Sequence, residues 1–447
     1  ERRDLLLSQR PPRFDESLDS MISRSEDDFT RIALKAKAAQ DYFLLIGPPG
    51  TGKTSCALKK MVETFHADKD AQILLLSYTN RAVDEICKSL ASIAPAVDFI
   101  RVGSELSCDE AYRGHLIENE LSSCNRRSEV YERIRNCRII VGTVAAISGK
   151  PELFRLKHFD VAIIDEATQI LEPQLLGILC ARGEDGKDAI DKFVLIGDHK
   201  QLPAVVQQNT EQSAIYDESL LSIGLTNLKD SLFERLYRNC TATVHRSYDM
   251  LCRQGRMHPE VALFANRAFY GGRLIPVGLP HQIESSDTIC RLAFYPSVPE
   301  KAGASAKINY SEARIVADLA ARIYEDHQTD FDESRTLGII TPYRSQIALI
   351  KKEIESLGIP ALNRILVDTV ERFQGSERDV IIYSFCVNYP YQLKFLSNLT
   401  EEEGVLIDRK LNVALTRARK QMFITGVPEL LERNPLYKSL LKLIESF

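Results

Sequence analysis

Short apolar runs alternate along this chain with longer segments that repeat apolar residues at a helical period. The runs are almost continuously apolar, which is typical of parallel strands that are buried on both faces of a sheet. Segments such as 311–325 and 345–358 have the amphipathic pattern of helices that pack one face against a sheet. The runs expected to form strands are 42–46, 73–77, 138–142, 161–165 and 193–197 in the first half of the chain, and 291–295, 336–340, 366–370, 379–386 and 422–426 in the second.

The strand and helix patterns recur in both halves, which predicts two α/β domains with parallel sheets. We expect these domains in residues 1–235 and 236–447, because a chain of 447 residues is too long for one core. Two segments differ from the pattern. Residues 104–136 are polar and are expected to form a helical insertion, whereas residues 206–227 are rich in Gln, Ser, Thr and Asn and are expected to form a long mobile loop.

The composition is that of a soluble globular protein, with 44% hydrophobic and 27% charged residues. No apolar run is long enough to span a membrane and no secretory signal opens the chain. We therefore expect an intracellular protein without a membrane partner, in the nucleus of a eukaryote or the cytoplasm or nucleoid of a bacterium. Because the chain starts at Glu1 instead of Met, we expect a piece of a longer polypeptide whose upstream domains lie outside it. The net charge of −5 neither requires nor excludes a nucleic-acid partner, and the ten cysteines, which include no CxxC pair, are expected to be reduced.

The stretch GPPGTGKT at 47–54 predicts a phosphate-binding loop. It follows the apolar run 42–46 and precedes a helical pattern, which is the context that such a loop requires. Backbone N–H groups and the helix N-terminus would face the phosphates, Lys53 would bridge the β- and γ-phosphates, and the Thr54 hydroxyl would bind Mg²⁺. The residues expected to bind the nucleotide are Gly47, Pro48, Pro49, Gly50, Thr51, Gly52, Lys53, Thr54 and Ser55.

Polar residues follow two further strands at the same edge of the expected sheet. Asp165 ends the run 161–165 and is expected to hold Mg²⁺, and Glu166 is expected to accept a proton from the attacking water. Gln201, in GDHKQLP, is expected to contact the γ-phosphate or the attacking water; the alternative is an ordinary turn residue before Pro203. An acidic pair after a strand is usually only the start of a loop, but beside a phosphate-binding loop it favours hydrolysis over binding alone.

The second half has no phosphate-binding loop, but it carries arginines near its start and its end. The stretch from Leu411 to Met422 is expected to form a helix with one apolar face. Residues two apart on a helix lie about 200° apart, so Arg417 and Arg419 would point to opposite sides. If the two domains face each other across a cleft, Arg256 and one of these arginines can meet the γ-phosphate. The alternative is a solvated helix with surface arginines.

Eight stretches of the sequence occur in the order seen in superfamily 1B helicases, so the chain resembles that family. They are GPPGTGKT (47–54), SYTNRAVDEI (77–86), DEATQ (165–169), GDHKQLP (197–203), QGRMHP (254–259), GIITPYRSQ (338–346), TVERFQGSERD (369–379) and LNVALTRAR (411–419). More narrowly, the chain resembles the branch that contains the nonsense-mediated-decay RNA helicase and the Okazaki-fragment nuclease-helicase. DYFLLIGPPGTGKT and LSYTNRAVD look closer to the nuclease-helicase.

The resemblance implies two tandem RecA-like domains, hydrolysis of ATP with Mg²⁺, and 5′-to-3′ movement along single-stranded DNA in replication or repair. It places an arginine finger at Arg417 and another at Arg256, and leaves Arg419 structural or facing the strand. Gln374 and Glu377 are further candidates for nucleotide contacts. We also expect a monomer. An RNA helicase of the same superfamily and a nucleotide-switched clamp that binds single strands without unwinding are the alternatives.

A single strand lying across the ends of both sheets needs hydroxyl and amide donors for its phosphates and flat side chains for its bases. Suitable residues follow strands in both halves, at positions that match the family's strand-binding motifs. Taken singly, Ser and Thr at strand ends most often cap or turn the chain. Tyr343 is the best candidate for stacking on a base, and its alternative is packing under its own loop. The candidates are Thr79, Asn80, Thr143, Thr341, Pro342, Tyr343, Arg344 and Thr369.

The sequence departs from its relatives at the two positions that usually contact the base. Relatives usually carry a Gln upstream of the phosphate-binding loop that reads adenine, and a Tyr before the arginine of the QGRMHP motif. Here these positions are Phe29 and Gly255, so both base-reading groups are replaced. We therefore expect weak discrimination between nucleotide bases, because apolar contacts distinguish them poorly. The alternative is that Phe29 stacks on adenine while backbone groups read its edge.

Overall fold

The computed structural model describes residues 2–209, 211–243, 245–285, 289–300, 305–402 and 404–447. The chain forms two compact units. Unit 1 consists of Glu1–Pro48, Gly52–His199 and Pro203–Leu251, and unit 2 of Pro49–Thr51, Lys200–Leu202 and Cys252–Phe447.

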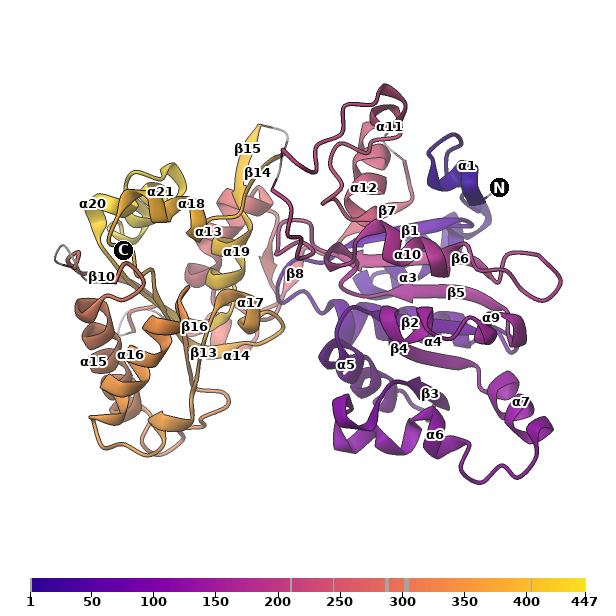
Figure 1. Cartoon of the computed structure of the whole chain (residues 1–447), viewed down its shortest axis with the longest axis horizontal. Helices are drawn as coiled ribbons and strands as arrows, with labels where there is room; N and C mark the ends of the chain where they lie inside the picture. Colours follow the sequence, from indigo (N-terminus) through magenta and orange to yellow (C-terminus); the bar gives the residue numbers. More distant parts are fainter. Residues whose placement is uncertain (1, 210, 244, 286–288, 301–304, 403) are drawn as a thin grey trace. The chain divides into compact units, whose positions relative to one another are not determined.

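Unit 1 is built on a seven-stranded parallel sheet in the order β3–β4–β2–β5–β6–β1–β7 (Figure 1). The five runs expected in the first half all form strands, because each is apolar enough to be buried on both faces. The apolar pattern does not indicate β3, which contains the charged Arg101, or β7, which has only three residues. The strands are β1 Tyr42–Ile46, β2 Ile73–Ser77, β3 Phe99–Val102, β4 Ile139–Thr143, β5 Phe159–Ile164, β6 Ile190–Gly197 and β7 Tyr248–Met250.

Helices cover both faces of this sheet (Figure 1). Successive side chains of β1 enter different cores, since Leu44 packs with α8, α10 and α12, whereas Phe43 packs with α3, α4 and α5. The helices of unit 1 are α1 Arg2–Leu6, α2 Asp19–Arg24, α3 Asp28–Ala38, α4 Lys59–His66, α5 Asn80–Ala91, α6 Ile117–Glu120, α7 Arg127–Asn136, α8 Val144–Ser148, α9 Glu152–Leu156, α10 Glu172–Leu179, α11 Glu218–Ser222 and α12 Leu232–Ala242.

Unit 1 extends beyond the boundary expected at residue 235. The helix α12 runs across that position, and its side chains Leu232, Phe233 and Leu236 belong to a core of unit 1. After α12, β7 pairs with β1, and the division into units falls after Leu251. A helix that buries one face against the sheet therefore occupies the segment in which the sequence indicates a domain junction.

The two segments that differ from the strand–helix pattern have distinct structures. Residues 104–136 contain several short helices, including α6 and α7. Residues 206–227, of which residue 210 lies outside the described part, contain the five-residue helix α11. All ten cysteines are free thiols. In the part of the chain that the structure describes, no helix has the length and apolar character needed to cross a membrane.

The start of the chain is tied to unit 1 through Asp41, the residue before β1. Arg10 and Arg13 each place an Nη2 atom beside Asp41 Oδ1, at 2.8 and 2.9 Å, and the backbone N–H of Arg13 donates to Oδ2 at 2.7 Å. Leu5 and Leu6 pack into the core of unit 1 that also contains Leu44. The carboxylate is buried, so its two arginines and the backbone N–H replace the water that folding removes.

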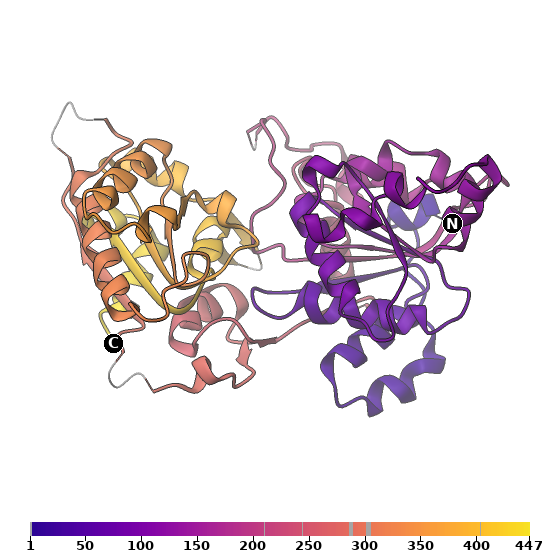
Figure 2. The same ribbon diagram turned by 90° about the horizontal axis from the view of Figure 1, so that it is seen from below.

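Unit 2 is built on a five-stranded parallel sheet in the order β10–β16–β13–β11–β12, seen from a second direction in Figure 2. Each of the five runs expected in the second half forms one of these strands. Two pairs of shorter strands, β8–β9 and β14–β15, lie outside this sheet. The strands are β8 Arg253–Gln254, β9 Ile275–Pro276, β10 Leu292–Pro296, β11 Leu337–Ile340, β12 Leu366–Asp368, β13 Arg378–Ser384, β14 Leu399–Glu402, β15 Val405–Asp408 and β16 Ala418–Gly426.

The amphipathic segments 311–325 and 345–358 form the helices α15 and α16, as expected, and pack with Leu337 and Val380 in one core. The helices of unit 2 are α13 Pro259–Tyr270, α14 Pro280–Ile283, α15 Tyr310–Asp326, α16 Arg344–Glu355, α17 Val370–Phe373, α18 Leu393–Leu396, α19 Arg409–Leu415, α20 Pro428–Leu431 and α21 Pro435–Ile444.

The expectation that one helix continues to Met422 is wrong, because α19 ends before Thr416. The Thr416 hydroxyl donates back to a carbonyl of the last helical turn at 2.7 Å, and β16 begins at Ala418 and pairs with β13. The hydrogen bonds of this ladder outweigh the helical spacing of the apolar residues. Arg417 therefore lies in the turn and Arg419 in a strand, so the argument that they point to opposite sides of a helix does not apply.

We expect Asp41→Asn to lower the free energy of unfolding at pH 7 by about 2 kcal/mol, because it removes a buried charge that receives charge-assisted hydrogen bonds. Burial opposes ionisation of Asp41, but hydrogen bonds from Arg10 and Arg13 outweigh it and hold its pKa well below the ordinary range. A lowered pKa stabilises the fold above the unfolded value of about 4, and this contribution is lost as the pH falls further.

The measurement is chemical or thermal unfolding of wild type and Asp41→Asn at pH 7 and at about pH 3, where the difference should be smaller. Asp19→Asn is the matched control, since Asp19 pairs with Arg246 at the exposed surface and its loss should change stability little. A difference at Asp41 that does not change with pH would contradict the electrostatic origin.

Candidate functional site

The phosphate-binding loop lies between β1 and a π-helix, Lys53–Leu58, that continues into α4. Gly52 has a φ of 76°, a left-handed conformation that favours glycine. At Gly47 an added β-carbon would come within 2.0 Å of Lys53 Cγ, so only glycine lets the lysine side chain fold back along the loop. The strand, the loop and the helix thus have the arrangement that the sequence predicts.

Four side chains of unit 1 meet beside this loop. Thr54 Oγ1 donates to Asp165 Oδ2 at 2.5 Å, and Lys53 Nζ lies 3.5 Å from Glu166 Oε1. Asp165 follows β5, and Glu166 comes next with a φ of 53°, an uncommon conformation for a residue other than glycine. Gln169 donates to Glu166 Oε2 at 3.0 Å and so restrains the carboxylate. The structure brings together the residues expected to hold Mg²⁺ and to activate water.

The carboxylate of Asp165 lies in an environment that disfavours its charge. Burial and the neighbouring Glu166 carboxylate raise the pKa of Asp165 to about 6, although Lys53 acts in the opposite direction. A divalent cation beside these oxygens would relieve that cost. The Thr54 hydroxyl and the Asp165 carboxylate are hard oxygen ligands of the kind Mg²⁺ takes together with nucleotide phosphates and water, so they fit the ion.

A cavity of unit 1 lies away from this loop. Its volume is about 600 Å³, and residues that precede β5 and β6, such as Lys157 and Asp188, line it. It is therefore at the amino-terminal edge of the sheet, opposite the edge where the phosphate-binding loop begins. The cavity takes no part in the site.

Phe29 lies beside the phosphate-binding loop. It belongs to α3, is half-buried, and its Cζ atom is 3.5 Å from the point where a β-carbon on Gly52 would be. The residue that stands at the expected adenine-reading position is therefore close to the loop, but it offers an aromatic ring in place of an amide. In unit 2, a β-carbon on Gly255 would contact the apolar side chains of Val277 and Leu279 at 3.4 and 3.3 Å.

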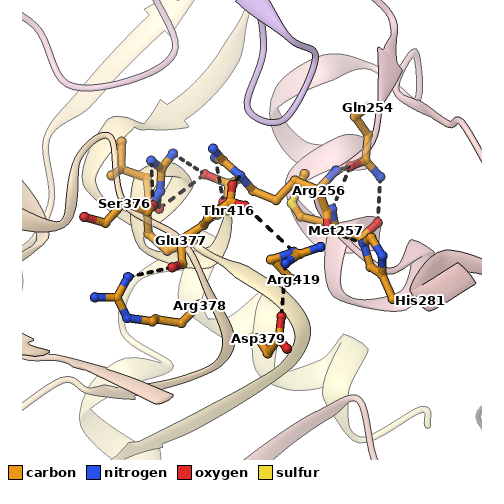
Figure 3. A network of polar contacts seen from close by, with 12 residues as sticks. Gln254, Arg256, Met257, His281, Ser376, Glu377, Arg378, Asp379, Thr416 and Arg419 are labelled. Carbon is orange, nitrogen blue, oxygen red and sulfur yellow. Dashed lines mark hydrogen bonds and ion pairs between the residues drawn. The ribbon is translucent and has the colours of Figure 1, made fainter. Parts of the chain in front are cut away.

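Arginine and acidic side chains form a connected network in unit 2 (Figure 3). Arg256 Nε lies 2.5 Å from Glu377 Oε2, and Arg256 Nη1 donates to the carbonyl of Thr416 at 3.3 Å. Arg419 Nη1 lies 3.4 Å from Asp379 Oδ1 and its Nε lies 3.8 Å from Glu377 Oε1. Burial opposes ionisation of Glu377, but the arginines outweigh it and lower its pKa. Glu377 is thus a charged carboxylate that pairs with both Arg256 and Arg419.

Arg417 is buried, which a helix with surface arginines does not explain. Its Nε donates to the carbonyl of Val413 at 2.9 Å and its Nη1 to the carbonyl of Ser376 at 3.5 Å. Within the same unit, Nη2 donates to Gln201 Oε1 at 3.3 Å. The Arg417 side chain therefore joins the end of α19 to the loop before β13. It also contacts Gln201, so two of the residues expected to be catalytic lie together.

The turn that carries Arg256 is held by residues that the sequence pattern did not single out. The buried Gln254 accepts hydrogen bonds from the backbone N–H groups of Arg256 and Met257 at 3.0 and 2.8 Å. His281 Nε2 lies 2.8 Å from the carbonyl of Arg256 (Figure 3). Gln254 lies within the QGRMHP motif, which is the one signal that points to it. His281 comes from α14 and only the tertiary structure identifies it.

In unit 1 the residues expected to contact a single strand follow β2 and β4. Thr79 and Thr143 cap α5 and α8, with Oγ1 accepting from backbone N–H groups at 3.2 and 3.1 Å. Capping uses the hydroxyl as an acceptor and leaves its proton available to a phosphate. Asn80 is the first residue of α5. Tyr78, which sequence reasoning missed, is 41% exposed immediately before Thr79 and offers a ring at this sheet edge.

In unit 2 the expected strand contacts differ in their access to solvent. Thr341 is fully buried, and its Oγ1 has no hydrogen-bond partner among the described residues. Tyr343 is half-buried and its hydroxyl is held by Gln392 at 3.2 Å. Arg344 is exposed, whereas Pro342, Thr369 and the nucleotide candidate Gln374 are partly buried. Thr341 lies too deep in this structure to present its hydroxyl to a strand.

Comparisons with known proteins support the resemblance to helicases. Two family models, both described as "AAA domain", match residues 228–429 and residues 24–130 with 117–209. The chain is 28% identical to "DNA replication ATP-dependent helicase/nuclease DNA2" of Bos taurus, over 99% of this chain and 42% of that protein. It is 30% identical to the protein of the same name of Gallus gallus, over 98% of this chain and 41% of that protein.

A shorter relative covers a larger share of its own length. The chain is 24% identical to "DNA polymerase alpha-associated DNA helicase A" of Saccharomyces cerevisiae, over 94% of this chain and 67% of that protein. Against the first two relatives, the chain spans about two fifths of their length. The expected fold of two RecA-like domains with parallel sheets is confirmed. The chain belongs to the superfamily 1B helicases, with a core related to the branch of the helicase/nucleases.

Proposed function

We propose that the chain is the motor of an ATP-dependent helicase that moves 5′-to-3′ along single-stranded DNA in replication or repair. The observation that carries the proposal is the meeting of Lys53, Thr54, Asp165 and Glu166 beside the phosphate-binding loop. The relatives are named for DNA replication and as DNA helicases, which supports DNA as the substrate. The resemblance alone supports the 5′-to-3′ direction. Such a motor acts as a monomer wherever the cell keeps its DNA.

The residues of unit 1 divide the hydrolysis between them. Lys53 pairs with Glu166 in this structure, and the β- and γ-phosphates of ATP would attract Lys53 and leave the Glu166 carboxylate facing the attacking water. Thr54 and Asp165 would hold Mg²⁺, which when bound neutralises charge on the β- and γ-oxygens. Gln169 keeps the Glu166 carboxylate oriented. The Oε1 atom of Glu166 would then accept the proton of the water that attacks the γ-phosphate.

The arginines of unit 2 supply the remaining charge stabilisation. We assign this role to Arg256 and Arg417, as the resemblance implies, because an arginine finger stabilises the charge that spreads over the transferring phosphoryl group. Glu377 pairs with Arg256 and keeps its guanidinium extended from the turn formed by Gln254. A phosphate would compete with Glu377 for the same donors. Arg419, paired with Asp379, is structural.

The experiment that tests the proposal is steady-state ATP hydrolysis with no nucleic acid, with single-stranded DNA and with RNA, followed by strand displacement. Stimulation by DNA together with displacement supports the proposal. Stimulation by RNA alone indicates an RNA helicase. Binding of single strands with turnover but no displacement indicates a clamp, because hydroxyl and amide contacts to phosphates hold a strand in either case.

We expect Glu166→Gln to bind ATP while its strand-stimulated turnover falls by roughly 10²-fold or more, because glutamine keeps the shape but cannot accept the proton. Nucleotide binding and hydrolysis are measured separately. Lys53→Ala is the companion variant and should abolish hydrolysis, since no other cation of the loop replaces its contacts. Wild-type turnover in Glu166→Gln would make this carboxylate a spectator.

We expect Arg417→Ala to reduce strand-stimulated ATP hydrolysis by about 10³-fold or more, and Arg419→Ala to reduce it far less. Arg419 is held by the carboxylate of Asp379, whereas Arg417 contacts Gln201, another residue expected to be catalytic. Unfolding midpoints of both variants distinguish lost catalysis from lost folding. The variant Arg417→Lys keeps the positive charge but lacks the paired N–H donors of the guanidinium. Equal losses at the two positions, or a larger loss at Arg419, would exclude this assignment.

We expect GTP or CTP to be hydrolysed with a kcat/KM within about tenfold of that for ATP, because Phe29 and Gly255 offer no hydrogen bonds from side chains to the base. The measurement is hydrolysis of the four nucleotides on single-stranded DNA. Phe29→Gln supplies an amide at this position and should increase the preference for ATP. A wild-type preference well beyond about tenfold, or 1.4 kcal/mol, would refute the expectation.

A further inference from the structure

Three aromatic side chains form a row on the surface of unit 2 after β13. The rings of Tyr389 and Tyr391 stack with centroids 5.7 Å apart, and those of Tyr391 and Phe395 meet edge to face at 6.5 Å. Tyr391 is 54% exposed and Phe395 is 69% exposed. We name these three residues the aromatic row. Single exposed apolar residues need no explanation, but a contiguous row indicates a surface that binds something.

A buried amide holds the row in place. Gln392 is 2% exposed, and its Oε1 accepts hydrogen bonds from the backbone N–H groups of Asn388 and Tyr389, both at 2.9 Å. Its Nε2 donates to the carbonyl of Ala306 at 2.7 Å and lies 3.2 Å from the hydroxyl of Tyr343. One side chain therefore fixes the turn that starts the row and the ring of Tyr343.

The position of the row in the sheet agrees with this connection. The row follows the carboxyl end of β13, and Tyr343 follows the carboxyl end of β11. These two strands are parallel neighbours, so the residues after them lie at the same edge. Tyr343 is the residue of unit 2 that we expect to stack on a base. The row therefore continues the proposed strand site along one edge of the sheet.

The charged side chains of the segment that carries the row favour a polyanion. Between residues 385 and 400 the only charged residue is Lys394, which is exposed and lies within the row's helix α18. Arg344, next to Tyr343, is exposed as well. Acidic residues begin only at Glu401, on β14. Aromatic rings interleaved with basic side chains are the surface that single-stranded nucleic acids bind without sequence preference.

We propose that the aromatic row is a base-stacking extension of the single-strand site. Tyr391 and Phe395 stack on unpaired bases, and Lys394 contacts a phosphate between them. The inference rests on the proposed function, because it requires a chain that binds single strands. It adds contacts beyond the motifs of the sequence, and it gives Gln392 the role of a positioning residue that joins the row to Tyr343.

The first test is binding of oligothymidylate, and of an abasic strand of the same length, to the full chain without nucleotide. Tyr391→Ala and Phe395→Ala should each weaken binding of oligothymidylate by roughly 5-fold or more, as expected for the loss of one stacked base. Neither variant should change binding of the abasic strand, which keeps every phosphate. Tyr216→Ala is the matched control, since Tyr216 is 81% exposed in unit 1.

A second test uses the absence of tryptophan from the sequence. Phe395→Trp introduces a single fluorescent reporter, whose emission should be quenched by oligothymidylate and not by the abasic strand. In Tyr216→Trp neither strand should quench the emission. Quenching measures contact with a base directly, so a general loss of folding or of phosphate binding cannot produce this pattern.

Several outcomes would overturn the inference. Unchanged binding of oligothymidylate in both alanine variants, without quenching in Phe395→Trp, would leave the row as a surface for another protein. Equal losses of the normal and the abasic strand would assign the row to folding instead of stacking. If the wild-type chain binds neither strand, the proposed function itself fails, and this result is distinguishable from a wild type that binds while the variants are unaffected.

Discussion

The site of unit 1 depends on parallel strand pairing, which ends β1, β5 and β6 at one edge of the sheet. The chain leaves β1 into the phosphate-binding loop and leaves β5 into Asp165 and Glu166, so both segments must meet. A hydrogen bond of 2.5 Å from Thr54 to Asp165 joins the two segments. Because the strands are buried on both faces, a shift of register would disrupt the two cores, and the packing therefore fixes the distance between the lysine and the acids.

Arginine and acidic side chains are concentrated in one network of unit 2. A buried ion pair loses much of its attraction to desolvation, and well-packed apolar residues often stabilise a core as well. Yet Glu377 and Asp379 hold Arg256 and Arg419, and Arg417 is buried against backbone carbonyls. Such an arrangement keeps arginines extended and partly stripped of water, which lowers the cost of their transfer to a phosphate. For Arg256 and Arg417 this arrangement is what their proposed role in charge stabilisation requires, whereas the pair of Arg419 with Asp379 is structural.

The sequence predicts ten of the twelve strands of the two parallel sheets and the contents of the unit 1 site, because both depend on local rules. Buried parallel strands are apolar runs, and the phosphate-binding loop is a contiguous motif. Tertiary pairing decides the features that were not predicted. The pairing with β13 makes β16 begin at Ala418, so the helix expected to reach Met422 ends with α19 at Leu415. The partners of Arg417 and the contact of His281 come from distant segments, and no spacing in the sequence indicates them.

Phosphate recognition and base recognition rest on different physical constraints in this chain. The groups expected to contact phosphate are bonded to one another, as Thr54 is to Asp165 and Lys53 is paired with Glu166, so replacing one disturbs the rest. The Phe29 ring lies beside the loop, and the backbone N–H of Gly255 donates to the carbonyl of Gly50 at 2.8 Å, but neither residue has a side-chain group in that network. We therefore expect a side-chain substitution at either position to disturb the phosphate site less than a substitution within the network. The motor proposed above would work by the energy of phosphoryl transfer, which hardly depends on the base, so the expected base-reading positions would be freer to change than the phosphate-contacting ones.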